Sequence, residues 1–359
     1  MRVELIAQLE QTLGSVLVAQ ENFRRVLAYG PVQREVEALE QGAGLIEHSS
    51  FRRVEAHGKD RVRFLNGMLS NELKSLVAGQ GTYGLLLTTQ GKVVADVTVY
   101  VFDEKLLLTF SPQVAQAGRE MLEKFLIADK VTWQEISEEL AQLSLQGPQA
   151  AEVLRRCFPG VTLPTEPHSL MAHSLSEGEL LIAAEDTLGL SGFELFMPWV
   201  HYEPIWRALS VAGAVPVGER AFDVVRIRYG IPQVGTDVGP QNIPLEAGEL
   251  LESRAIHYKK GCYIGQEVVC RVKSRGHVNW MLTAFELPLE AQVGQRLFAG
   301  EKDVGWITSI ADEEPSGRRG LGYVHRNARQ LGQALQIGSA GSGLQAQLLA
   351  PGTRTVAAL

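Results

Sequence analysis

The sequence is poor in cysteine and has no segment typical of a secreted or membrane protein. Its 359 residues include three cysteines, Cys157, Cys262 and Cys270, which form no Cys-x-x-Cys pair. A [4Fe–4S] cluster commonly needs four thiolates, so any cluster would need ligands from another molecule. No apolar run reaches about 18 residues, and the first residues lack a secretory hydrophobic region. We therefore expect a cytoplasmic protein with reduced thiols and no membrane contact.

Motifs for nucleotide, zinc and nucleic-acid binding are also missing. The chain has no Gly-x-x-x-x-Gly-Lys-Ser/Thr loop, and its eight histidines form no His-Glu-x-x-His pair. These absences argue against nucleotide-driven chemistry and against a zinc site, and we expect no bound metal. A net charge of −7 disfavours nucleic-acid binding, although one basic group remains within residues 259–275. That group would suit the anionic tail of a small molecule.

The hydrophobic pattern predicts a mixed α/β protein with a β-rich end. A chain of 359 residues with 45% apolar content is long enough for two or three domains. Leucines at helical spacing predict a helical leader over residues 4–28, and strands alternate with helices after it. Beyond about residue 278 the apolar runs are short and separated by glycine-bearing turns. That pattern is typical of a small β-barrel or sandwich.

Residues 260–267, Lys-Gly-Cys-Tyr-Ile-Gly-Gln-Glu, combine a thiol, an amide, a carboxylate and two glycines. Gly261 and Gly265 indicate a shaped loop, because glycine permits positive φ and close backbone approach. Lys259 and Lys260 precede Cys262, and neighbouring positive charge favours the reactive thiolate. The alternative is that Cys262 is a small buried hydrophobe, as most free cysteines are.

The same eight residues resemble the signature of the YgfZ family of folate-binding proteins. These are bacterial relatives of a mitochondrial iron–sulfur assembly factor and of the glycine-cleavage T-protein. The resemblance continues over most of the chain, from about residue 60 to about residue 325, in segments 60–71, 226–232, 242–248, 268–276, 305–309 and 322–324. It implies an α+β fold with a T-protein-like folate-binding core of two related α/β subdomains and a C-terminal β-barrel.

The resemblance also implies domain limits. The folate-binding core would occupy residues 1–277, with subdomains at about 45–145 and 146–245 and a signature loop at 255–277. The β-barrel would occupy residues 278–359.

Site residues follow from the resemblance in the same way. Gly192-Phe193-Glu194 resembles a T-protein segment whose carboxylate binds the pterin ring, and a carboxylate can accept two parallel hydrogen bonds. The alternative is a surface glutamate at a strand edge. The expected tetrahydrofolate-binding residues are Glu194, Asn71, Lys260, Tyr263, Gln266, Glu267 and Arg271. The expected catalytic residues are Cys262 and Asp96.

Segment 91–96 resembles a T-protein element that ends in two acids, but its first acid is replaced by Ala95. Neighbouring strand residues point to opposite faces, so Asp96 would not replace an acid at position 95. A general acid or base must lie within about 3 Å of its proton. We therefore expect negligible aminomethyltransferase turnover.

Three functions remain open from the sequence. In the first, a tetrahydrofolate-binding accessory protein supports assembly or repair of iron–sulfur clusters, with iron–sulfur enzymes or assembly proteins as partners and Cys262 as the reactive thiol. In the second, the protein is a folate-dependent aminomethyltransferase or demethylase that uses Asp96. In the third, it binds folate without chemistry and Cys262 only packs.

Overall fold

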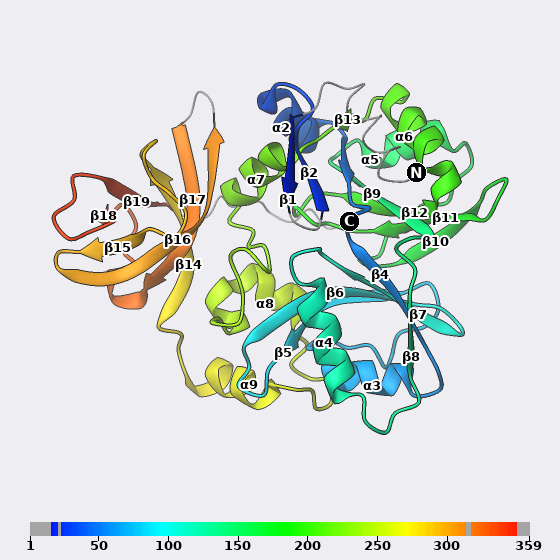
Figure 1. The fold of residues 1–359 in the computed structure, drawn as a ribbon, viewed down its shortest axis with the longest axis horizontal. Coiled ribbons are helices and arrows are strands. Elements are labelled where there is room, and N and C mark those ends of the chain that lie inside the picture. Colours follow the sequence, from blue (N-terminus) through cyan, green and yellow to red (C-terminus); the bar gives the residue numbers. More distant parts are fainter. Residues whose placement is uncertain (1–15, 21–22, 314–316, 350–359) are drawn as a thin grey trace.

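Two β-sheets and a closed β-barrel form the framework of the protein in a computed structural model, which describes residues 16–20, 23–313 and 317–349. The two sheets lie side by side, and the barrel lies beside both (Figure 1). The predicted α+β class with a C-terminal barrel is confirmed. Among the described residues, no helix is both long and apolar enough to cross a membrane.

The first sheet has five strands in the order β5-β6-β7-β4-β8. These strands are β4 (Arg52–His57), β5 (Gly81–Leu87), β6 (Val93–Val101), β7 (Lys105–Phe110) and β8 (Thr132–Glu135). The core on one face includes residues from helices far apart in the chain, such as Met121, Leu251 and Val269. The elements around this sheet are α3 (Arg61–Met68), α4 (Ala115–Phe125), η2 (Pro244–Ala247), α8 (Glu249–Ala255) and α9 (Gln266–Arg275).

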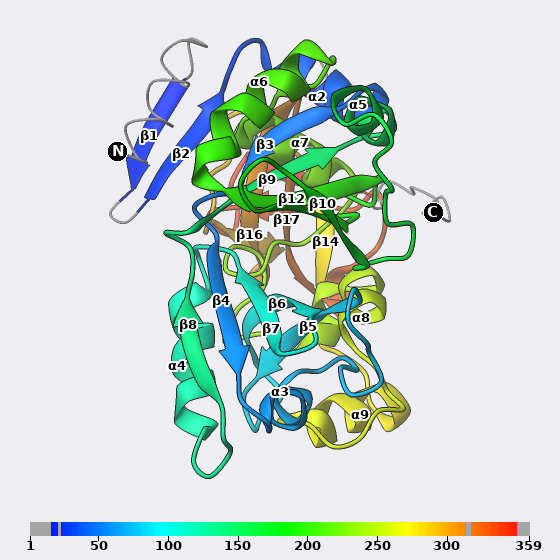
Figure 2. The ribbon, with the colours of Figure 1, turned by 90° about the vertical axis from the view of Figure 1, so that its right-hand side faces the viewer.

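The second sheet has six strands in the order β10-β11-β12-β9-β3-β13. They are β3 (Gly44–Glu47), β9 (Leu140–Gln146), β10 (Leu170–Ser174), β11 (Glu179–Ala184), β12 (Gly192–Pro198) and β13 (Val215–Pro216). The helices with it are α2 (Val32–Gln41), α5 (Ala150–Cys157), η1 (Trp199–His201), α6 (Tyr202–Val211) and α7 (Glu219–Arg228). Figure 2 shows this sheet above the first one.

The two sheets are interleaved along the chain. Strand β3 precedes the whole first sheet, yet it pairs with β9, which follows that sheet. The expected subdomain boundary at residues 145 and 146 therefore falls inside β9, and β3 lies with the second sheet rather than the first. This crossing brings the ends of β3, β9 and β12 close to β6 and β7, where the cavity described below lies.

The barrel closes in the order β14-β17-β16-β15-β18-β19, and closure leaves no unpaired sheet edge. Its elements are β14 (Trp280–Leu287), β15 (Arg296–Ala299), β16 (Lys302–Glu313), β17 (Gly317–His325), η3 (Arg326–Ala328), β18 (Ala334–Ile337) and β19 (Gln345–Leu349). The expected start at residue 278 lies just before β14. The pattern of short apolar runs did not reveal β18, which has four residues.

Hydrogen bonds and one ion pair from α7 attach the barrel to the core. Arg226, which is 2% exposed, donates to Asp237 at 2.7 Å and to the barrel residue Ser309 at 3.0 Å. Arg228 donates from the same helix to the barrel residue Glu313 at 3.2 Å. Removing one partner of such a pair leaves an uncompensated buried charge, so these contacts fix the barrel against the core.

Two predicted segments differ from the structure. Residues 16–20 and 23–28 form the antiparallel strands β1 (Val16–Gln20) and β2 (Phe23–Ala28) instead of the predicted helix, whose remaining residues lie outside the described part. Branched residues such as Val16 and Val18 favour strands, and pairing in a hairpin overrides the leucine spacing. The expected signature loop at 255–277 contains the ten-residue helix α9.

Candidate functional site

A cavity of about 250 Å³ lies where the two sheets, α7 and the segment 231–234 meet. Both sheets contribute acidic side chains to its wall, and the first sheet and α7 contribute aromatic ones. The carboxylates are Glu47, Asp96, Glu185, Glu194 and Glu219, and the aromatic residues include Phe51, Tyr83, Tyr100 and Phe222. Clefts with an apolar wall and a few convergent polar groups are typical of small-molecule sites.

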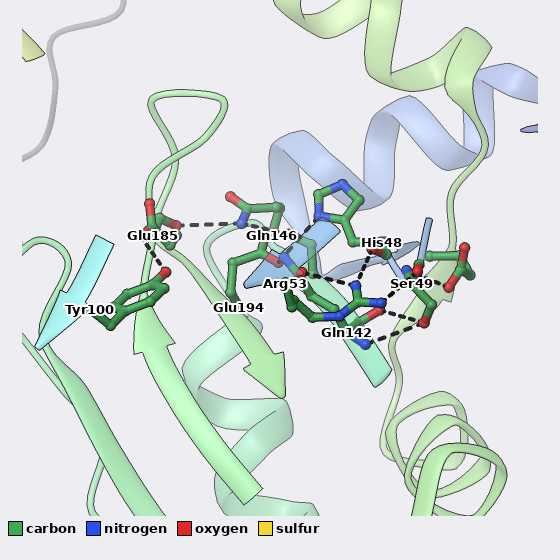
Figure 3. A network of polar contacts seen from close by, with 10 residues as sticks. His48, Ser49, Arg53, Tyr100, Gln142, Gln146, Glu185 and Glu194 are labelled. Atoms are coloured by element: carbon green, nitrogen blue, oxygen red, sulfur yellow. Dashed lines mark hydrogen bonds and ion pairs between the residues drawn. The ribbon is translucent and has the colours of Figure 1, made fainter. Parts of the chain in front are cut away.

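Glu194 lies on β12 at one side of this cavity and is 6% exposed. Gln142 donates to Glu194 Oε2 at 2.7 Å, and His48 Nδ1 lies 3.2 Å from the same oxygen. Figure 3 shows these three side chains converging. The His48 ring stacks on Phe51 with 4.3 Å between ring centroids. The structure thus places Glu194 in the cavity wall and not at an exposed strand edge.

Arg53 supports this part of the cavity from behind. Its side chain is fully buried and donates to the carbonyls of Ser49 at 2.8 Å and of Ser137 at 3.2 Å (Figure 3). It also donates to His48 O at 3.3 Å and to Gln142 Oε1 at 3.4 Å. Burial lowers the pKa of Arg53 to about 10, so the guanidinium stays charged at neutral pH. Arg53 therefore fixes both residues that contact Glu194.

Asp96 faces the cavity from β6 on the other side. Tyr83 donates its hydroxyl to Asp96 Oδ2 at 3.0 Å, whereas Asp96 Oδ1 is buried and has no hydrogen-bond partner in the described part of the chain. Burial raises the pKa of Asp96 to about 6, against an ordinary value of 3.8. A carboxyl group that titrates near neutral pH is suited to accept and return a proton. An unpartnered buried oxygen in a cavity marks where a ligand would donate.

The structure corrects the interpretation of Ala95. Ala95 is fully buried in the core of the first sheet, where its Cβ lies 3.0 Å from the place a Cβ on Gly118 would occupy. An acid at position 95 would point into that core, because alternate residues of β6 face opposite sides of the sheet. The cavity-facing residue is Asp96. The argument that Ala95 removes an acid from the cavity is therefore wrong, whereas the expected lack of turnover stays a prediction.

A buried His168–Glu185–Tyr100 group lies beside Asp96 and was missed in the sequence. Glu185 Oε1 is 2.8 Å from His168 Nδ1 and accepts the Tyr100 hydroxyl at 2.7 Å. Burial alone would raise the pKa of Glu185, but its partners outweigh that effect and lower the pKa. Among the described residues, His168 is the single non-glycine with positive φ, at 59°. Such strain is concentrated at functional sites.

Sequence spacing alone would not have revealed this group. Tyr100 and His168 are 68 positions apart in the sequence. The one available signal was the acidic pair Glu185-Asp186 directly after a predicted strand.

The signature residues lie outside the cavity wall. Lys260 is buried and donates to three main-chain carbonyls, and Tyr263 is buried with an unpartnered hydroxyl. Cys262 is exposed on the segment before α9. The remaining signature residues are half-buried Gln266 and the exposed ion pair Glu267–Arg271. The structure therefore does not bring these six residues together with Glu194.

Asn71 also lies behind the cavity wall, not in it. Its amide donates to the carbonyls of Tyr83 at 2.9 Å and of Arg254 at 3.0 Å, and both of those residues line the cavity. Asn71 thus contacts the backbone of two wall residues.

One of the two signature glycines is required by the backbone. Gly265 has φ +83° at the start of α9, and a Cβ there would lie 2.6 Å from Thr88 O. Apart from its two chain neighbours, no described residue places a heavy atom within 4 Å of the Cβ position of Gly261. The prediction of a glycine-dependent turn thus holds for Gly265.

The family model of the GCVT N-terminal domain matches residues 6–259. The chain belongs to this family. An aminomethyltransferase of Rubrobacter xylanophilus is 29% identical over 318 residues, which cover 88% of this chain and 84% of that protein. A chloroplastic protein of Arabidopsis thaliana, named as a transferase, is 27% identical over 316 residues, which cover 87% of this chain and 72% of the relative.

The fold agrees with that assignment. The crystal structure of the glycine cleavage system aminomethyltransferase T from Bartonella henselae superposes with a TM-score of 0.83. The two chains are 22% identical, and the superposition covers 97% of this chain and 96% of the other. The similarity extends over the barrel as well as both sheets.

Asp96→Asn is expected to stabilise the folded protein at pH 7 by up to about 3 kcal/mol, since each pKa unit corresponds to about 1.4 kcal/mol. Because the pKa is about 6 in the folded state and ordinarily 3.8, the folded protein binds the proton more tightly between these values. Stability contributed by Asp96 therefore falls as pH rises through this window.

Urea unfolding at pH 3.5 and at pH 7 measures this effect. The gain should fall to a few tenths of a kcal/mol at pH 3.5, where the acid is mostly protonated in both states. Asp103→Asn, at an exposed position, serves as the control. A loss of stability at pH 7 in Asp96→Asn would contradict the burial of a costly charge.

Proposed function

We propose that the cavity binds a reduced folate and that the protein transfers a one-carbon unit between an amine and that folate, in the manner of an aminomethyltransferase. One observation carries the proposal: the same cavity holds a donor-supported carboxylate, Glu194, and a second acid, Asp96, with an unpartnered oxygen and a pKa of about 6. The family assignment and the aminomethyltransferase relatives support it.

The residues of the wall fit a folate. A pterin ring presents amino and amide N–H groups along one edge, which a carboxylate such as Glu194 accepts side by side. The aromatic side chains Phe51, Tyr83 and Phe222 supply apolar surface for a flat ring. A bound reduced folate would supply the nitrogen that carries the one-carbon unit.

Asp96 would move the proton. Asp96 lines the cavity, its buried Oδ1 atom has no hydrogen-bond partner among the described residues, and Tyr83 donates to Oδ2. Near its pKa of about 6 the carboxyl group exists in both protonation states, so it can take a proton from an ammonium group and return it. The His168–Glu185 ion pair keeps a second, ionised carboxylate close by.

A role in iron–sulfur maintenance is the second candidate, and it rests on the position of the signature. The YgfZ-like segment displays an exposed Cys262 away from the cavity wall, where another protein could reach it. Within the described ranges, no group of three or more His, Cys, Asp or Glu residues could hold a metal. In this role the protein would act with the thiolates of a partner and keep its folate cavity.

Glu194→Ala is expected to weaken tetrahydrofolate binding about 5- to 150-fold. A buried ligand edge left without its acceptor costs about 1–3 kcal/mol. Isothermal calorimetry measures the affinity, and Glu179→Ala, at an exposed position on neighbouring β11, is the matched control. Unchanged affinity in a folded Glu194→Ala variant would remove Glu194 from the folate site.

Asp96→Asn is expected to lower aminomethyltransferase turnover about 10²- to 10⁴-fold while tetrahydrofolate affinity changes little, because general acid–base catalysis contributes that range. The assay supplies tetrahydrofolate and an aminomethyl donor, and it scores binding and turnover separately. Wild-type protein that binds tetrahydrofolate without any turnover would overturn the transferase proposal and favour the accessory role.

Cys262 is expected to react with a thiol-specific alkylating agent faster than Cys157. Cys262 is exposed, whereas Cys157 is half-buried and burial raises the pKa of its thiol. Mass spectrometry of time-resolved alkylation measures both sites, with half-buried Cys270 as the internal reference. A Cys262→Ser variant that folds and fully supports iron–sulfur enzymes in a cell lacking its own homologue would exclude the thiol from the accessory role.

A further inference from the structure

Lys260 is a buried cation enclosed by main-chain carbonyls. Its side-chain ammonium donates to Asn66 O at 2.7 Å, Leu69 O at 2.6 Å and Asn71 O at 2.6 Å, and the residue is 6% exposed. These carbonyls lie at and just after the C-terminal end of α3, where helix carbonyls lack intrahelical partners. A cation there also complements the helix dipole. Lys260 therefore holds the segment 66–71 in one conformation.

The same segment ties β5 to the end of α8. The Asn71 amide donates to Tyr83 O at 2.9 Å and to Arg254 O at 3.0 Å. These two residues are 171 positions apart in the sequence. Ser70 repeats the connection, because its hydroxyl donates to Ala255 O at 2.6 Å and accepts from Leu85 N at 2.8 Å. Segment 66–71 thus sets the spacing between two parts of the cavity wall.

Tyr83 connects that segment to Asp96. Its hydroxyl donates to Asp96 Oδ2 at 3.0 Å. The Arg254 guanidinium lies 5.4 Å from the centroid of the Tyr83 ring, and the His168 ring stacks on Tyr83 at 6.4 Å. Tyr83 is therefore held at its backbone by Asn71, along its ring by Arg254 and His168, and at its hydroxyl by the reactive acid.

We propose that Lys260 and Asn71 are positioning residues for Asp96, acting through the segment 66–71, the Tyr83 backbone and the Tyr83 hydroxyl. In this role Lys260 positions a residue of the cavity wall and does not itself contact a ligand. Its connection to folate chemistry rests on the proposed function, whereas its effect on the proton affinity of Asp96 does not.

The charge environment of Asp96 makes this effect measurable. The Tyr83 hydroxyl on β5 and the Arg254 guanidinium at the end of α8 both favour the ionised carboxylate, and burial opposes it. The His168–Glu185 pair faces Tyr83 from the second sheet. Displacement of Tyr83 or Arg254 removes a stabilising contact from the charged form, so the Asp96 midpoint rises. Burial lowers the pKa of Lys260 to about 8, which leaves it charged at neutral pH.

The test is an NMR titration of protein labelled with [¹³Cγ]aspartate, without folate, in which Asp96→Asn assigns the resonance. Tyr83→Phe is the reference, because it deletes the hydrogen bond directly and should raise the midpoint. Asn71→Ala and Lys260→Met should raise it as well, by at least about half a pH unit, or about threefold in proton affinity. Lys259→Met is the matched control, because Lys259 is exposed, and it should leave the midpoint unchanged.

A merely structural role would lower the melting temperature and leave the midpoint at its wild-type value, and that result in folded Asn71→Ala and Lys260→Met would overturn the proposal. If Lys260→Met does not fold, the Asp96 titration midpoints of Asn71→Ala and Lys260→Gln test the proposal instead. Lys260→Gln keeps an N–H donor at this position. Tetrahydrofolate calorimetry on the same variants is read separately. A protein whose midpoints shift as expected but which binds no tetrahydrofolate would refute the proposed function and leave this inference standing.

Discussion

Removal of acidic side chains from water is the constraint on which the central cavity depends. A buried carboxylate is costly unless donors replace its hydration. Glu194 is hydrogen-bonded by Gln142 and His48, and Glu185 is hydrogen-bonded by His168 and Tyr100.

Asp96 Oδ2 accepts one hydrogen bond, from the Tyr83 hydroxyl, and Oδ1 has no hydrogen-bond partner among the described residues. Two acids of the same cavity wall therefore differ: the pKa of Glu185 lies below its ordinary value and that of Asp96 above it. Carboxyl groups separated in this way take different chemical roles.

The donors come from widely separated parts of the chain, so the cavity depends on the interleaved topology. His48 follows β3, which precedes the first sheet, and it meets Gln142 of β9 only because β3 pairs with β9. Buried Arg53 then links both residues and the turn after β3. A sheet built without β3 would lose half of the support of Glu194.

The signature segment has the residue composition of a ligand-binding site, but its residues support the cavity wall and do not form part of it. Lysine, glycine and tyrosine in residues 260–265 suggested direct ligand contacts. In the structure, Lys260 stabilises the end of α3, and Gly265 allows the turn into α9 against Thr88. Neither residue lines the cavity.

The sequence by itself determined the α+β class, the C-terminal barrel and Glu194 as a candidate, because strand periodicity and segment resemblance are local properties. It also determined that residues 95 and 96 point to opposite faces of β6, since strand side chains alternate. Only the tertiary structure decided that Asp96 faces the cavity and Ala95 the core, because α4 covers one face of the sheet and the second sheet meets the other. The partners His168 and Glu185, and the path from Lys260 to Tyr83, also required the folded chain, because they join residues that no sequence spacing relates.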